Sequence, residues 1–207
     1  MSDELPRRGP GRPKSVDRQG AIELAMKNYW REGVHSLSLN ELCRRARLSK
    51  PALYREFGGE DGLMDAALAY YDLRIVQPVL DAVAMERPFG ELVELLIAGM
   101  TTAEGASDGC LFTEMRLARG SFGEKTEQRV RAMEMRRRQV FEAWFSSALG
   151  RGEVARSVSP KLAGRYIDAQ ISNVLMQMGA GETPELVAEQ ARLAFLVLQP
   201  SRPLERP

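Results

Sequence analysis

Two short helix signals, each with its own start, lie within residues 38–58 and are joined by a connection of about three residues. The first starts at Ser38, followed three residues later by Glu41, which is the pattern of a capping box. The second starts at Ser49, has a proline in its first turn and stops at Gly58. Isolated helices shorter than about 12–15 residues are marginal in water. Both helices must therefore be held in place by packing on the rest of the chain.

The second short helix has one apolar side, formed by Leu53 and Phe57, which we expect to pack on the protein. The opposite side is predicted to face solvent. It contains Lys50, Ala52, Tyr54 and Arg55. A short, rigidly held helix can enter the major groove of DNA with its N-terminal residues near base edges, while a capped helix start and a lysine suit phosphates. This segment therefore predicts a helix-turn-helix in which the second helix contacts DNA.

The charge distribution agrees with that prediction. Residues 1–60 contain 12 Lys+Arg and 8 Asp+Glu, whereas the whole chain of 207 residues has a net charge of only +1. We expect residues 1–15 to form a disordered basic arm. Its basic residues are Arg7, Arg8, Arg12 and Lys14. The segment "RRGPGRPK" resembles an AT-hook, which follows a narrow minor groove, although a solubilising charged tail has the same composition.

Helical periodicity continues through the rest of the chain, so an all-α fold is predicted. Residues 16–71 are expected to form a three-helix DNA-binding domain, and residues 72–207 a larger helical domain. The second domain should contain a long helix over 124–149, with Arg137 on its apolar side. The run Arg136-Arg137-Arg138 is interpreted as solvated surface, with a second nucleic-acid patch as the alternative.

The segment "LSLNELCRRARLSKPALYREF", with the helix before it, resembles the DNA-binding domain of the tetracycline-repressor (TetR) family. The resemblance extends over roughly residues 16–70. It implies a homodimer in which a larger helical domain binds a small ligand. The paired DNA-binding domains would bind a palindromic double-stranded operator, and members of the family are most often repressors. The chain departs from the family pattern at Arg47, where the turn usually has a glycine, and at Glu60, where a lysine often contacts phosphate.

The ligand site is predicted from aromatic, apolar and placed polar residues, which are typical of small-molecule pockets. The candidates are Tyr70, Tyr71, Cys110, Phe112, Met115, Phe141, Trp144, Tyr166, Asn173 and Met176. Plain core packing explains each of them as well. Cys110 lies at a predicted helix start, where a thiol can be activated. It is therefore either a sensor of oxidants or electrophiles or a small buried residue.

The last two predicted helices, over 160–178 and 184–198, are apolar on more than one side. One side is assigned to a second subunit, although internal burial gives the same pattern. The candidate dimer residues are Ile167, Ile171, Val174, Met178, Val187, Ala191 and Phe195.

Several classes of site have little support. Two distant cysteines, Cys43 and Cys110, and one histidine, His35, favour neither a disulfide framework nor a zinc site nor a Ser-His-Asp triad, so no metal, cofactor or catalytic residue is predicted. A signal peptide and a membrane span are not indicated, so a cytoplasmic protein is expected. The remaining alternative is an all-helical enzyme or adaptor with an incidental basic arm.

Overall fold

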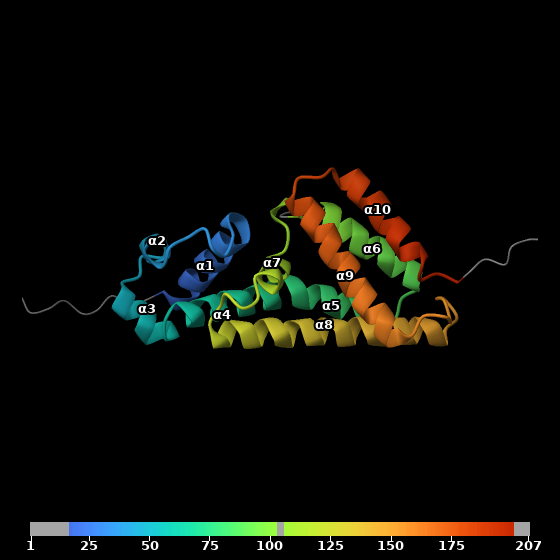
Figure 1. Cartoon of the computed structure of the whole chain (residues 1–207), viewed down its shortest axis with the longest axis horizontal. Helices are drawn as coiled ribbons and strands as arrows, with labels where there is room; N and C mark the ends of the chain where they lie inside the picture. Colours follow the sequence, from blue (N-terminus) through green and yellow to red (C-terminus); the bar gives the residue numbers. More distant parts are fainter. Residues whose placement is uncertain (1–16, 103–105, 201–207) are drawn as a thin grey trace, which may run out of the picture.

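The computed structural model describes residues 17–102 and 106–200, and every regular element in these ranges is a helix (Figure 1). The predicted all-α fold class is therefore confirmed. A head is formed by α1 (Arg18–Glu32), α2 (Leu39–Arg45) and α3 (Lys50–Phe57). A connecting helix follows, made of α4 (Glu60–Tyr71), the π-helical segment η1 (Asp72–Val76) and α5 (Gln77–Val83) without a break. The body contains α6 (Phe89–Thr102), η2 (Ala106–Asp108), α7 (Leu111–Leu117), α8 (Glu124–Gly150), α9 (Pro160–Gly179) and α10 (Pro184–Leu196).

The head is built around α1, which supplies the packing surface that the two short helices need. Its first turn is capped by Asp17, whose Oδ1 accepts a hydrogen bond from the backbone N–H of Gly20 at 2.9 Å. It ends at Gly33, whose φ of +89° is available to glycine at little cost. The buried side of α1, which includes Ala25 and Tyr29, packs against α4.

The connecting helix lies lengthwise beside α8 and joins the head to the body (Figure 1). Its central π-helical turn begins at Asp72. Such turns are rare and occur frequently at functional sites. The predicted domain boundary at residue 72 coincides with the junction of α4 and η1, inside a continuous helical segment. The division into two domains at this point stays a prediction.

The core of the body lies between α8, α9, α6 and α10. α8 and α9 approach closely at Gly164, where an added Cβ would stand 2.8 Å from the backbone nitrogen of Glu142. α8 matches the long helix expected over residues 124–149 to within one residue. Within the described ranges, no helix has both the length and the apolarity required to cross a bilayer.

The arginine run on α8 is not solvated surface, and that interpretation is wrong. Arg137 is only 3% exposed, Arg136 pairs with Asp72 of η1, and Arg138 pairs with Glu134 at 2.6 Å. Consecutive helical residues point about 100° apart. Because both the connecting helix and α9 pack on α8, two of these three directions lead into the protein.

Candidate DNA-binding and effector sites

The two short helices begin at the predicted caps. Ser38 Oγ accepts a hydrogen bond from the backbone N–H of Glu41, and Ser49 Oγ accepts one from the backbone N–H of Ala52, both at 3.3 Å. α3 ends at Gly58, whose φ is +77° and whose N–H donates to the carbonyl oxygen of Tyr54 at 2.9 Å. The start and end of the predicted recognition helix are thus fixed by local hydrogen bonds.

The Glu41 side chain does not complete a capping box and instead receives hydrogen bonds from Arg44 and Arg45, the shortest at 2.6 and 2.8 Å. These bonds lower the pKa of Glu41 to about 2. Arg45 also pairs with Glu32 and donates to Asn28 Oδ1 at 3.2 Å, both on α1. Glu41 and Arg45 therefore fasten α2 to α1.

The turn between α2 and α3 passes through Arg47, the only non-glycine residue with positive φ in the described ranges, at 52°. This is the position where the family pattern usually has glycine. The N–H of Arg47 donates to Arg44 O at 3.2 Å and that of Leu48 to Cys43 O at 2.9 Å. Leu48 is buried, so the turn is held by both hydrogen bonds and packing.

α3 packs through Leu53 and Phe57, which are both buried as predicted. Its exposed residues include Lys50, Arg55 and Tyr54, the last with 59% of its surface accessible. The two cap residues, Ser38 and Ser49, are also exposed.

The expectation that Ala52 faces solvent is wrong, because Ala52 is 7% exposed and belongs to the core. It lies in the first turn of a helix that packs on both α2 and α4, so a side chain as short as one methyl group is covered.

The remaining charged residues near α3 differ in whether they form ion pairs. Arg55 pairs with the neighbouring Glu56 at 3.0 Å. Lys50 has no ion pair with any residue in 17–102 or 106–200. Glu60 is exposed in the first turn of α4. The arm residues Arg7, Arg8, Arg12 and Lys14 lie outside the described residues.

Part of the predicted effector site comes together where the connecting helix meets α7. Tyr71 donates its hydroxyl hydrogen to Cys110 Sγ at 3.4 Å, and its ring meets that of Trp30 edge-on at 5.0 Å. Burial, followed by the neighbouring Cys110, raises the pKa of Tyr71 well above its ordinary value. Cys110 is the N-cap residue of α7 and is buried.

Next to this pair lies a buried charged cluster that the sequence did not predict as a site. The Arg137 guanidinium stands over the rings of Phe112 and Phe141, 4.9 and 5.8 Å from their centroids. Asp168 of α9 faces Arg137 Nε at 3.0 Å and accepts a hydrogen bond from Arg116 at 2.7 Å. The available signal was a lone arginine on the apolar side of the long helix. Of the predicted ligand residues, Cys110 thus contacts Tyr71, and Phe112 and Phe141 contact Arg137, while Met115 is buried in the same helix as Phe112.

The other predicted ligand residues lie elsewhere. Trp144 stacks on Phe89 at 4.6 Å, and Tyr70 donates to Glu23 at 3.0 Å on α1. Tyr166 donates to the carbonyl oxygen of Ala194 at 2.8 Å, between α9 and α10. The remaining two, Asn173 and Met176, are exposed on the outer side of α9, so their assignment to an internal pocket is corrected.

The predicted dimer residues are also corrected, because all of them are buried within the single chain's own core. They are Ile167, Ile171, Val174, Met178, Val187, Ala191 and Phe195. The opposite sides of the same two helices expose apolar side chains at helical spacing. We call these residues the outer stripe: Leu162, Ala169, Met176, Leu186, Leu193 and Val197.

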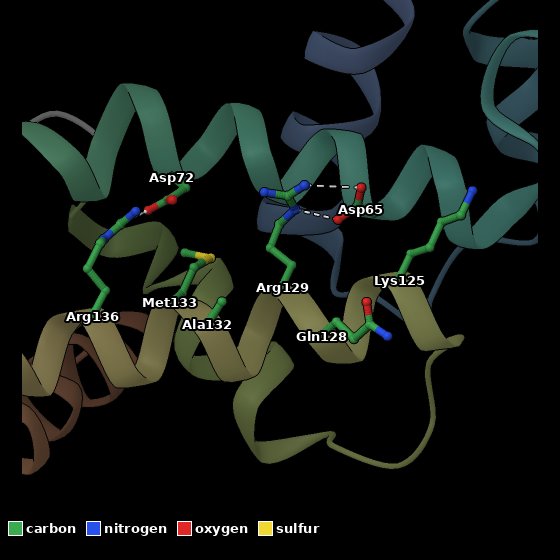
Figure 2. A pocket seen from close by; sticks show the side chains of 8 residues that line it. All are labelled: Asp65, Asp72, Lys125, Gln128, Arg129, Ala132, Met133 and Arg136. Carbon is green, nitrogen blue, oxygen red and sulfur yellow. Dashed lines mark hydrogen bonds and ion pairs between the residues drawn. The ribbon is translucent and has the colours of Figure 1, made fainter.

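An open cleft of about 450 Å³ separates the connecting helix from α8 (Figure 2). Arg129 pairs with Asp65, and Arg136 with Asp72, across this cleft. Met133 lies between the two arginines and contributes to the lining. These two ion pairs join the connecting helix to α8. The head contacts the body directly at another place, where Trp30 donates to the carbonyl oxygen of Gly109 at 3.1 Å and the N–H of Val34 donates to Glu114 at 3.1 Å.

A family model described as bacterial regulatory proteins, tetR family, matches residues 21–67. The chain is 37% identical over 70 residues to the HTH-type transcriptional repressor ComR of Escherichia coli, covering 34% of this chain and 33% of ComR. It is 32% identical over 110 residues to the repressor BdcR of the same organism, covering 52% of this chain and 56% of BdcR. The chain thus spans between one third and just over half of the curated relatives it matches.

Two solved structures are similar over nearly the whole chain. The regulator CifR, a cysteine mutant in complex with 26-bp operator DNA, has a TM-score of 0.73 at 21% identity and covers 91% of this chain and 100% of its own. Reduced NemR of E. coli has a TM-score of 0.75 at 12% identity, with coverages of 89% and 99%. These likenesses establish the fold. The matched proteins are transcriptional regulators, in agreement with the expectation that the chain is not an enzyme.

Proposed function

Because the chain belongs to the TetR family of bacterial regulatory proteins, we propose that it is a DNA-binding transcriptional repressor whose hold on its operator is controlled by an effector. The observation that carries this proposal is the capped helix α3, which is anchored by Leu53 and Phe57 and presents Lys50 and Tyr54 to solvent. A rigid, exposed helix of this length fits the major groove. The CifR complex supports it, since that protein of the same fold was solved on operator DNA.

Exposed donors around α3 can position the helix on the duplex. Ser38, Ser49, Lys50 and Arg55 supply hydroxyl, ammonium and guanidinium groups that suit phosphates, while the Tyr54 ring suits a base edge or methyl group. The basic arm, Arg7 to Lys14, adds phosphate or minor-groove contacts in this proposal.

The repressor acts as a homodimer in this proposal, with the outer stripe of α9 and α10 as the interface. Its six apolar residues, three on α9 and three on α10 or its C-cap, would be covered by a second copy. A dimer places two recognition helices about one turn of DNA, roughly 34–36 Å, apart and fits a palindromic operator.

Effector control acts through the connecting helix. A ligand near Tyr71 and Phe141, or a modification of Cys110, would act where the connecting helix, α7 and α8 meet. The CifR structure is that of a cysteine mutant and the NemR structure that of a reduced form, which supports testing Cys110. DNA is released only by an effector that binds the released state more tightly.

Gel shifts with the DNA upstream of the protein's own gene test this function. Wild type should bind, whereas Tyr54→Ala and Lys50→Ala should bind about 5- to 150-fold more weakly because one contact is worth roughly 1–3 kcal/mol. The matched control is Arg156→Ala, which removes an exposed charge from the body. Equal binding by all four proteins would exclude α3 from DNA recognition. A folded protein that binds no upstream DNA would favour the enzyme or adaptor alternative.

The cysteine route has its own test. Cys110→Ser should bind DNA like wild type but resist release by hydrogen peroxide and N-ethylmaleimide. If both proteins are released equally by these reagents, Cys110 is a packing residue.

A further inference from the structure

Asp168, buried in the body, faces more than one guanidinium group. Arg137 and Arg116 both direct their guanidinium groups at Asp168, whose side chain is 3% exposed. Within residues 17–102 and 106–200, neither arginine pairs with any other carboxylate. A third arginine, Arg138, which also pairs with Glu134, has its Nε 3.9 Å from Asp168 Oδ2. Arg116 and Arg137 therefore share one carboxylate, with a further guanidinium group at its edge. A buried charge without full compensation costs free energy of folding. A bound ligand could supply the missing negative charge.

Arg137 also has unused hydrogen-bonding capacity. Its side chain is 4% exposed, yet Nη2 finds no acceptor among the described residues. Its Nε lies 3.0 Å from Asp168 Oδ1 without a properly aligned hydrogen bond. The rings of Phe112 and Phe141 offset part of the charge through cation–π contacts but accept no conventional hydrogen bond. Within the part of the chain that the structure describes, Nη2 of Arg137 thus lacks an acceptor, and Nε has Asp168 nearby but out of line.

We propose that Arg137 binds the carboxylate of the effector, a small organic acid whose apolar body lies against Phe112 and Phe141. This inference rests on the proposed function and names the chemical class of the ligand. A guanidinium group matches a carboxylate in plane and spacing, and such charge-assisted pairs are strong in a low-dielectric interior. Aromatic walls with one oriented charge are typical of small-molecule sites.

The cleft of Figure 2 supplies the entrance. Met133 of α8 is one of the residues that line the cleft. Arg137 follows it by one helical turn and is buried, outside the residues that line the cleft. A methionine side chain is flexible enough to move aside for a ligand. The acid would then pass between Arg129 and Arg136, which also favour entry of an anion.

An acid bound along this path would also change how the protein binds DNA. The cleft is bounded by the connecting helix on one side and α8 on the other. An acid inserted beside Met133 presses these helices apart and loosens the Asp65–Arg129 and Asp72–Arg136 pairs. The connecting helix carries the head, so its displacement changes the spacing of the two recognition helices in a dimer.

Thermal unfolding of the full-length protein without DNA tests the site. The probes are butyrate, benzoate and 3-phenylpropionate, each compared at equal ionic strength with its neutral amide. At least one acid should raise the Tm of wild type while its amide does not. Arg137→Met, which retains the apolar stem volume, should bind that acid about 10- to 100-fold more weakly. The control Arg87→Met removes an exposed arginine and should respond like wild type.

A second variant keeps the test decisive if Arg137→Met fails to fold. Asp168→Asn leaves Arg137 in place and removes the carboxylate that competes for it, so the same acid should bind more tightly. Cys110→Ser should bind the acid like wild type. In this proposal the anion that pairs with Arg137 belongs to the ligand and is not an oxidised form of the Cys110 side chain.

The proposal is overturned if no acid raises the Tm of wild type more than its amide does. It is also overturned if an acid raises the Tm of Arg137→Met or of Asp168→Asn by the same amount as that of wild type. Gel shifts without any acid report separately on DNA binding. A protein that binds DNA but no acid contradicts this inference alone, whereas a protein that binds acid but no DNA contradicts the proposed function.

Discussion

Asp61 of α4 caps the start of α8, its Oδ1 accepting a hydrogen bond from the backbone N–H of Thr126 at 3.1 Å. Its Oδ2 accepts from the N–H of Lys125, 64 residues away, at 3.0 Å. The pairs Asp65–Arg129 and Asp72–Arg136 have the same separation of 64 residues. The connecting helix and α8 therefore run in parallel register, with acids on one and donors on the other (Figure 2). Sliding one helix along the other breaks all three contacts together.

The first prediction concerns this cap. Asp61→Ala removes the acceptor of two backbone N–H groups, so the free energy of unfolding in urea should fall by about 1–2 kcal/mol. Burial raises the pKa of Asp61, but the hydrogen bonds from Thr126 and Lys125 outweigh it and lower the pKa overall. The control is Glu86→Ala, at an exposed site between helices. Equal stability of the two variants would show that the cap contributes nothing.

The second prediction is a pH dependence at Glu41. Its pKa is lowered from 4.5 to about 2 in the folded protein by Arg44 and then Arg45, so the ionised carboxylate stabilises the fold. That contribution is complete above pH 4.5 and is lost as the pH falls through about 2. The stability difference between wild type and Glu41→Gln should therefore disappear over this interval, as measured by urea unfolding. A difference that persists at pH 2 would assign the effect to packing.

The sequence was sufficient where local chemistry decides the structure. Ser38, Ser49 and Gly58 determine where the short helices begin and end by hydrogen bonds to their own neighbours. The exposure of Ala52 was predicted wrongly because it depends on how α3 meets α2 and α4. Helical periodicity alone does not describe that packing.

The two sides of α9 illustrate the same limit. The residues on both sides are apolar, so helical periodicity could not distinguish the side that lies in the core from a side that faces another protein. Gly164 was the available signal, since it lies on the same side as Ile167 and Ile171 and allows α8 to approach. The place of Arg137 on the apolar side of the long helix indicated its burial, but its pairing with Asp168 could not be predicted from pattern, because Asp168 lies on another helix.

The third prediction concerns the outer stripe. Leu193 is 68% exposed in the single chain, so Leu193→Glu should leave the fold intact but place a charge inside the proposed dimer interface. Analytical ultracentrifugation should then report a monomer, and operator affinity should fall at least tenfold, since a single head loses the second half-site. Leu117→Glu is the matched control, because Leu117 is 70% exposed on α7. A dimeric Leu193→Glu protein would exclude this face.

The fourth prediction concerns the arm. Deleting residues 1–14 removes Arg7, Arg8, Arg12 and Lys14. If these side chains neutralise phosphates, each neutralised phosphate contributes about 0.9 to the slope of log K against log salt concentration, so truncation should make that slope shallower in proportion. If the arm contacts the minor groove instead, truncation should lower the affinity more for operators with A·T-rich flanks than for those with G·C-rich flanks. Fluorescence anisotropy with both operators at several salt concentrations separates these effects. An unchanged slope together with an unchanged flank preference would make the arm a solubilising tail.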